Sequence, residues 1–181
     1  MVRKKDLLGV VDSALRLEGK KREFYLASAS ATDDKNGKTV FKYLADEESE
    51  HITRLQKIRD ALAVNKRFLE DEKSPSKTRK CSIRLDAASE RALEHKALKN
   101  IIPEKTLACA SDLCALKTAV EIESESVVFY RKAVGDVCGE DGRRVLQLML
   151  EEEEEHLRSL RMQYAFLEAN GFWYDVELPF S

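Results

Sequence analysis

Proline and glycine are scarce in this sequence, which has three prolines and seven glycines among 181 residues. Because these two residues interrupt helices most often, their scarcity leaves long segments that can be helical. The four cysteines include no pair spaced as C-x-x-C, which argues against a zinc ribbon or a rubredoxin-type iron site. We therefore interpret Cys81, Cys109, Cys114 and Cys138 as reduced or buried thiols.

Long apolar runs and a strong charge of one sign are also absent. No apolar stretch approaches the roughly 20 residues that span a membrane, and the run after the basic N-terminal residues is too short for a secretory signal. A formal net charge of −2 gives no basic footprint for nucleic acid. We expect a cytoplasmic protein with neither a membrane nor a nucleic-acid partner, forming one domain over residues 1–181.

The segment 146–167 has apolar residues at alternating spacings of three and four, which places them on one face of a helix. Two polar residues, Glu153 and His156, stand in the middle of that face. The seven positions are Leu146, Met149, Glu153, His156, Leu160, Gln163 and Leu167. A carboxylate and an imidazole on an otherwise apolar face indicate more than a solvated helix surface.

The same pattern occurs earlier in the chain at a fixed offset of 105 residues, so that Glu48 and His51 correspond to Glu153 and His156. A second pair of segments follows the same offset and relates Glu18 to Glu123. The first segment of that pair contains Leu8, Val11, Leu15, Glu18, Arg22, Tyr25 and Ala29, and the second contains Leu113, Leu116, Val120, Glu123, Val127, Tyr130 and Val134. The chain is therefore two copies of one helix pair.

This repeat predicts an all-α fold, a ferritin-like antiparallel four-helix bundle of two helix pairs joined by a long crossover. The predicted helices run over about 6–31, 38–64, 111–134 and 142–169, giving helix pairs at 6–64 and 111–170. The crossover at 65–110 contains a short helix near 86–100, and the aromatic tail at 171–181 is expected to pack on the bundle or on a second subunit.

Stacking the four faces brings six polar residues into one layer of the predicted core. They are Glu18, Glu48, His51, Glu123, Glu153 and His156. Buried carboxylates repel one another, and two divalent cations would balance four of them while the imidazoles complete the ligand set. The alternative is a polar layer held by salt bridges with Arg22 or other basic residues. The repetition of the set favours metal, and oxygen and imidazole ligands without thiolate favour two iron ions, or manganese, over structural zinc.

Tyr25 and Tyr130 lie two turns beyond Glu18 and Glu123 on the same helical faces. A tyrosine hydroxyl in an apolar bundle needs an acceptor, so we expect each to donate a hydrogen bond to a ligating carboxylate.

The segments LRLEGKKREFY, LADEESEHITRL, VEIESESVVFY and MLEEEEEHLRSL resemble the four ligand helices of rubrerythrins, within the ferritin-like superfamily. The resemblance implies a non-haem di-iron centre that reacts with hydrogen peroxide or dioxygen. It also implies that Glu18 and Glu123 are terminal ligands, that Glu48 and Glu153 bridge the two metals, and that the two histidines are ligands.

Two features depart from typical rubrerythrins. This sequence has no paired C-x-x-C motifs for a rubredoxin domain, so electrons would come from a separate donor protein such as a rubredoxin. The position of an additional glutamate that rubrerythrins carry on the third helix is Ser126. We expect a homodimeric di-iron oxidoreductase that reduces hydrogen peroxide or dioxygen; the alternatives are a ferroxidase or iron-handling protein and a non-enzymatic metal-binding helical bundle.

Overall fold

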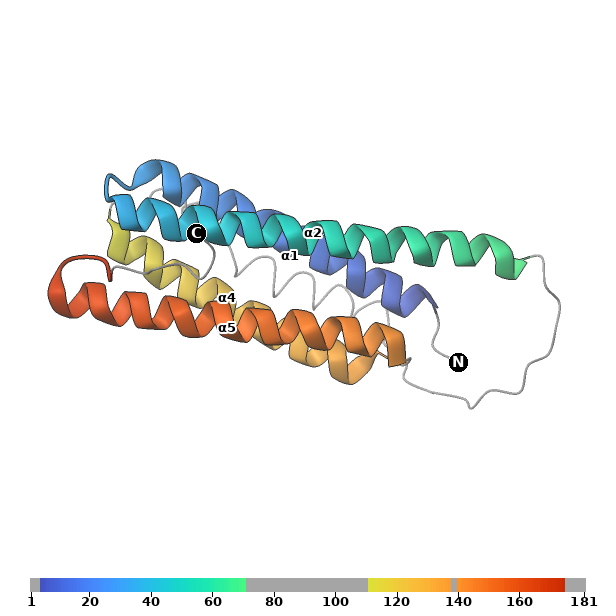
Figure 1. Ribbon diagram of the computed structural model, residues 1–181. Helices are drawn as coiled ribbons and strands as arrows, with labels where there is room; N and C mark the ends of the chain where they lie inside the picture. Colours follow the sequence, from blue (N-terminus) through green and yellow to red (C-terminus); the bar gives the residue numbers. More distant parts are fainter. Residues whose placement is uncertain (1–3, 71–110, 138–139, 175–181) are drawn as a thin grey trace.

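The computed structural model describes residues 4–70, 111–137 and 140–174, which contain four long helices. These are α1 (Lys4–Ala31), α2 (Lys35–Glu70), α4 (Asp112–Asp136) and α5 (Glu140–Asn170). Helices α1 and α2 form one antiparallel hairpin, α4 and α5 form another, and the two hairpins lie side by side in an elongated bundle (Figure 1). The predicted all-α bundle of two helix pairs is confirmed.

Parts of the sequence-based prediction lie outside the described residues. These are residues 71–110 of the crossover predicted at 65–110, with its short helix at 86–100, residues 175–181 of the tail, and Cys81, Cys109 and Cys138. Among the described helices, none is both long and apolar enough to cross a membrane.

The helix ends follow local capping chemistry, although several differ from the predicted positions. Helix α2 begins at Lys35 instead of 38 because the Asp34 carboxylate accepts hydrogen bonds from the backbone N–H groups of Asn36 and Gly37, at 2.8 and 3.0 Å. Helix α5 ends as predicted near Gly171, whose φ of 77° is the left-handed conformation that glycine adopts without strain.

Two other predicted boundaries are wrong. Helix α5 begins at Glu140, so Asp141 lies inside the helix and does not precede it. Helix α2 continues past the predicted end at Val64 to Glu70, because residues 65–70 include no proline or glycine that would interrupt it.

The apolar residues of all four helices meet along the bundle axis and form one core. Its large, fully buried side chains include Leu17, Phe41, Leu55, Leu116, Leu146, Met149 and Leu160. Burial of these side chains supplies most of the packing energy of the bundle. It also encloses the central polar layer, so the polar side chains there are held on four packed helices.

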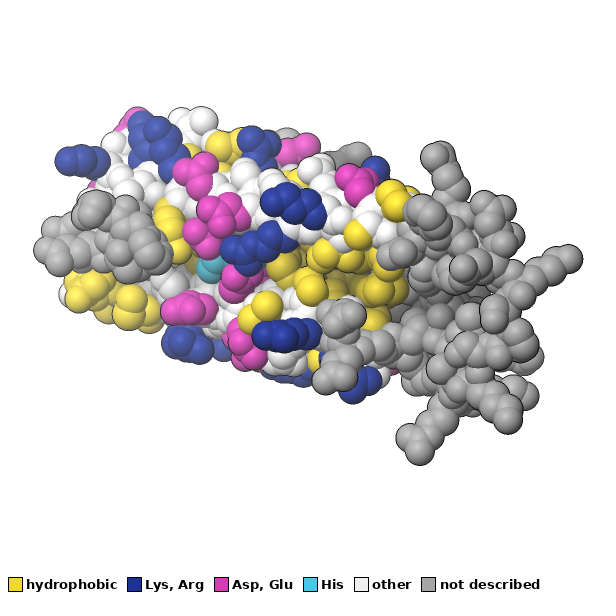
Figure 2. Space-filling view, turned by 45° about the vertical axis from the view of Figure 1, so that its right-hand side comes forward, with side chains coloured by type: hydrophobic (Ala, Val, Ile, Leu, Met, Phe, Trp, Pro, Cys, Tyr) yellow, Lys and Arg dark blue, Asp and Glu magenta, His cyan; other side chains and the backbone are white. Residues whose placement is uncertain are grey.

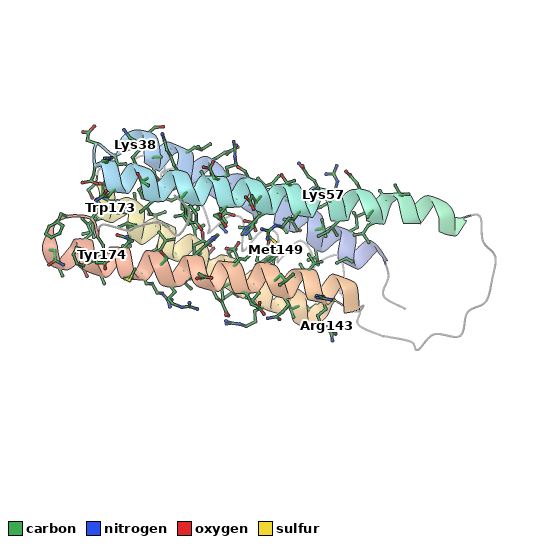
Figure 3. All side chains as sticks on the ribbon, in the orientation of Figure 1. Lys38, Lys57, Arg143, Met149, Trp173 and Tyr174 are labelled. Carbon is green, nitrogen blue, oxygen red and sulfur yellow. The ribbon has the colours of Figure 1, made fainter. Side chains whose placement is uncertain are left out.

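The described part of the tail packs back on the bundle. Trp173 is 3% exposed, meets Phe41 edge to face at 5.5 Å between ring centroids, and donates a hydrogen bond of 2.7 Å to the Asp112 carboxylate. It lies at the end of the bundle where α2 begins, near Lys38 (Figure 3). Gly37 permits this contact, because a Cβ there would come within 2.6 Å of the indole ring.

Candidate metal centre

The six polar residues predicted from the repeat lie together in the middle of the bundle. Helix α1 contributes Glu18, α2 contributes Glu48 and His51, α4 contributes Glu123, and α5 contributes Glu153 and His156. Five of the six are fully buried, and His156 is 6% exposed. Each helix pair thus supplies three of the six side chains.

Donor atoms of these residues form two groups, each with its ligand atoms within 4.8 Å of one another. One group contains Glu18, Glu48, His51 and Glu153, and the other contains Glu48, Glu123, Glu153 and His156. Glu48 and Glu153 belong to both groups, whereas the other four residues belong to one each. Two adjacent groups that share two carboxylates fit a dinuclear metal site.

The two histidines hold equivalent positions in this arrangement. Their rings are stacked with centroids 5.6 Å apart. The Nδ1 atom of His51 lies 3.1 Å from Glu48, and the Nδ1 atom of His156 lies 3.8 Å from the same carboxylate. Both Nδ1 atoms therefore face the carboxylate layer, as ligand atoms would.

The Nε2 atoms face outward, each toward a glutamate that sequence reasoning missed. Nε2 of His51 lies 3.1 Å from Glu152, and Nε2 of His156 lies 3.9 Å from Glu47. These glutamates each precede a shared carboxylate in sequence and are related by the same offset of 105 residues, which is the signal that would have found them. A carboxylate on the outer nitrogen fixes the orientation of a ligating histidine.

The two tyrosines connect the helix pairs. The Tyr25 hydroxyl on α1 donates to the Glu123 carboxylate on α4, and the Tyr130 hydroxyl on α4 donates to Glu18 on α1. Burial and the neighbouring carboxylates raise the pKa of both hydroxyls well above the ordinary 10.0, so both stay protonated as donors. Each terminal carboxylate of the layer is thereby held by the opposite helix pair.

Lys21, which sequence reasoning also missed, lies inside the layer. Its side chain is fully buried, and its Nζ atom lies 2.5 Å from Glu153, 2.9 Å from Glu48, 3.0 Å from Glu123 and 3.2 Å from Glu18. Arg22, which the repeat places on this face of α1 either beside a carboxylate or pointing outward, is exposed and donates a hydrogen bond to Ser49. Residues three and four positions after Glu18 both lie near its face of the helix, and the packing of α1 against its neighbours buries Lys21.

The four carboxylates of the layer do not ionise equally. Burial raises the pKa of Glu48 and Glu123 well above 4.5. At Glu18 and Glu153 burial also acts to raise the pKa, but the Lys21 ammonium and hydrogen bonds from neighbouring side chains together lower it. Burial alone would lower the pKa of Lys21, but the four carboxylates raise it well above 10.5, so its ammonium stays charged.

The histidines have opposite protonation states in this layer. Burial would lower the pKa of His51, but its hydrogen bonds to Glu152 and Glu153 raise it far above 6.5. Burial lowers the pKa of His156 to about 4. Metal binding at Nδ1 requires neutral imidazole, so it would release the His51 proton.

The donor atoms themselves fit a metal ion. Within the described residues, several buried polar atoms of the layer make no hydrogen bond, and these are Glu18 Oε2, Glu48 Oε1, Glu123 Oε2, Glu153 Oε1 and His156 Nδ1. The Lys21 ammonium lies within 3.2 Å of three of them, so it is their nearest cation in this structure. Carboxylate and imidazole atoms that converge from four helices with few hydrogen bonds of their own fit a divalent cation.

The rubrerythrin family model matches residues 10–164, which include all six donor residues. The chain belongs to the rubrerythrin family. The resemblance in the four helix segments is thereby confirmed, and the match ends before the aromatic tail. A search of curated proteins finds no significant match, and a search of solved structures finds none either.

Proposed function

We propose that this rubrerythrin-family chain is a di-iron oxidoreductase that reduces hydrogen peroxide, or dioxygen, with electrons from a separate donor protein. The observation that carries the proposal is the buried pair of donor groups that share Glu48 and Glu153. In this assignment Glu18 and His51 would complete one ion site, and Glu123 and His156 would complete the other. When bound, a ferrous pair supplies the two electrons that, with two protons, convert hydrogen peroxide to two water molecules.

The residues around the layer would hold these ligands in place. Tyr25 and Tyr130 orient the Glu123 and Glu18 carboxylates through hydrogen bonds, and Glu152 lies 3.1 Å from Nε2 of His51. Glu47 lies farther from Nε2 of His156, at 3.9 Å, and makes no hydrogen bond to it in this structure. Outer contacts with ligand side chains preserve ligand geometry while the charge of a metal site changes.

The layer comes closest to solvent at one histidine. On the face shown in Figure 2, a small area of histidine surface lies between acidic and basic side chains. His156 is 6% exposed while His51 is fully buried, so the layer reaches solvent at the His156 ring. We propose that a molecule as small as hydrogen peroxide approaches the layer at this ring.

Glu152 contacts a histidine of the layer from the solvent side. Its side chain is 35% exposed and lies 3.1 Å from Nε2 of His51. Its second contact is the Arg54 guanidinium at 2.5 Å. The Glu152 carboxylate, itself held by Arg54, would therefore fix the outer nitrogen of the ligating imidazole.

A second candidate is supported by Lys21, whose ammonium already neutralises part of the layer. The bundle would then be a non-enzymatic protein with an ion-paired polar core. This candidate predicts that replacing Glu153 changes stability and abolishes no reactivity.

The test is to load the protein with ferrous iron under anaerobic conditions and add hydrogen peroxide while recording the absorption spectrum. We expect the wild type to oxidise with one peroxide consumed per two irons, and Glu153→Gln to lose that reaction. Glu154→Gln is the matched control, because Glu154 is adjacent but pairs with Arg131 at the surface. Wild-type iron that stays ferrous in peroxide would overturn the proposal; iron oxidised by dioxygen and released to solution or stored would favour ferroxidase chemistry.

A further inference from the structure

Lys21 is the one cation from a lysine or arginine within the described part of the layer, and its place is unusual for such a side chain. Lysine is almost never fully buried unless it is paired, and here one Nζ atom lies within 3.2 Å of four carboxylates. Two of these carboxylates, Glu48 and Glu153, belong to both donor groups. The ammonium therefore lies between the two places where ions would bind.

The repeat shows that this cation is an asymmetric feature. The position on α4 that corresponds to Lys21 is Ser126, which is also fully buried but uncharged. The other members of the layer keep their residue type in both halves, as Glu18 and Glu123 do. Lys21 is thus an addition to an otherwise matched set of ligands.

The contacts of Lys21 use oxygen atoms that metal ions would need. Its closest contact is Glu153 Oε2 at 2.5 Å, and its contact with Glu48 is to Oε1 at 2.9 Å. A divalent ion on the same oxygens would stand a few ångströms from the ammonium. Two cations at that distance in a buried layer repel each other strongly.

Charge arithmetic gives the same result. Metal binding requires ionised carboxylates and neutral imidazoles; in that state the four carboxylates carry −4, and Lys21 reduces this to −3. One divalent ion then leaves −1, whereas a second ion would leave a net charge of +1 in the buried layer. The first ion is favoured by charge, and the second is favoured only if the ammonium leaves its central place.

We propose that Lys21 is an internal cation that competes with metal ions for the four carboxylates. It keeps the metal-free bundle folded by occupying the centre of the layer, and it makes the second ion bind more weakly than the first. This inference rests on the metal binding assumed in the proposed function, and it adds the residue that limits how much metal is bound.

The test compares the full chain with Lys21→Met and with Lys20→Met, a control at the adjacent lysine, which is only half-buried. Ferrous ion is titrated anaerobically into each metal-free protein by calorimetry, and thermal unfolding is followed by circular dichroism with and without iron. We expect Lys21→Met to bind the second ion about tenfold more tightly or better. We also expect its metal-free form to melt at a lower temperature and to gain more from iron, while Lys20→Met behaves as the wild type.

A variant that does not fold without metal still decides the question. If Lys21→Met and the shorter, polar Lys21→Gln are unfolded when metal-free, ferrous ion should restore their helical spectrum; failure to restore it overturns the proposal. Equal iron affinities in wild type, Lys21→Met and Lys20→Met would overturn the proposal that Lys21 competes with metal ions, but would leave metal binding by the layer intact. Absence of iron binding in all of them would overturn both this inference and the proposed function.

Discussion

Removing the Tyr130 hydroxyl tests how the layer is held together. Tyr130 is fully buried and donates to Glu18; burial acts to raise the pKa of that carboxyl, but Lys21 and hydrogen bonds from His51 and Glu48 together lower it. The acceptor is therefore an ionised carboxylate, and hydrogen bonds to charged groups contribute about 1.5 to 3 kcal/mol. We expect Tyr130→Phe to lower the free energy of unfolding of the metal-free protein by about 2 kcal/mol.

The equivalent change in the other half should cost less. Tyr25 donates to Glu123, whose pKa burial raises well above 4.5, so this acceptor ionises less readily than Glu18. A hydrogen bond to a less charged acceptor is weaker, and Tyr25→Phe should lose about 1 kcal/mol. The control is Tyr164→Phe, because the Tyr164 hydroxyl bonds Glu168 at the surface and should give no measurable change.

Urea denaturation at pH 7, followed by far-UV circular dichroism, measures all three variants on one scale. The expected order of loss is Tyr130→Phe, then Tyr25→Phe, then Tyr164→Phe. A loss of unfolding free energy in Tyr130→Phe no larger than that in Tyr164→Phe would mean that the buried hydroxyl contributes nothing to the layer. A larger loss in Tyr25→Phe than in Tyr130→Phe would mean that Glu18 is not the more strongly ionised acceptor.

Two further predictions concern the end of the bundle and the pH dependence. Gly37→Ala should lower the free energy of unfolding, measured by urea denaturation, by about 1 to 3 kcal/mol, because the added Cβ displaces Trp173. Gly9→Ala has open space around its Cβ and should raise that free energy by up to about 1 kcal/mol. Changes of the same sign in the two variants would contradict this prediction. His156 has a pKa of about 4 in the fold and about 6.5 when unfolded, so the unfolded chain binds more protons between these two pH values. The stability of the metal-free protein therefore falls as pH drops from 6.5 to 4, by up to about 3 kcal/mol from this group. Comparing the pH dependence of unfolding in the wild type and in His156→Gln measures that contribution, and identical slopes would contradict it.

The fold and the six donor residues can be predicted from the sequence because both halves of the repeat carry the same chemistry. An apolar face with a carboxylate, or a carboxylate and an imidazole, at its centre is recognisable from residue spacing alone. Two copies at one offset also give the pairing, so the sequence by itself matches Glu48 with Glu153. The fold then brings all six residues into two adjacent donor groups.

The sequence did not reveal Lys21, for a reason of helix geometry. Positions three and four residues after Glu18 both lie close to its face, and a strict alternation of three and four places Arg22 there. Which of the two is buried depends on the rotation of α1 against its neighbours, and a lysine is normally assigned to the surface. The buried pattern on α1 follows Val11, Ala14, Glu18 and Lys21 instead.

The helix ends and the tail depend on contacts that spacing cannot show. Asp34 caps α2 within a segment whose polar residues predict only a turn. Trp173 packs against Phe41 because Gly37 leaves room for the indole ring, a relation between residues far apart in sequence. Such pairings become visible only when the hairpins are placed together.

Binding of a pair of metal ions by the buried Glu and His layer is tested most directly by iron content. The iron bound per chain is measured after anaerobic loading with excess ferrous ion and removal of unbound metal, with circular dichroism to show that the chain is folded. We expect about two iron ions per folded wild-type chain and a clear loss in Glu153→Gln. A fully helical wild-type chain that retains no iron would contradict metal binding, and the layer would then be an ion-paired core centred on Lys21.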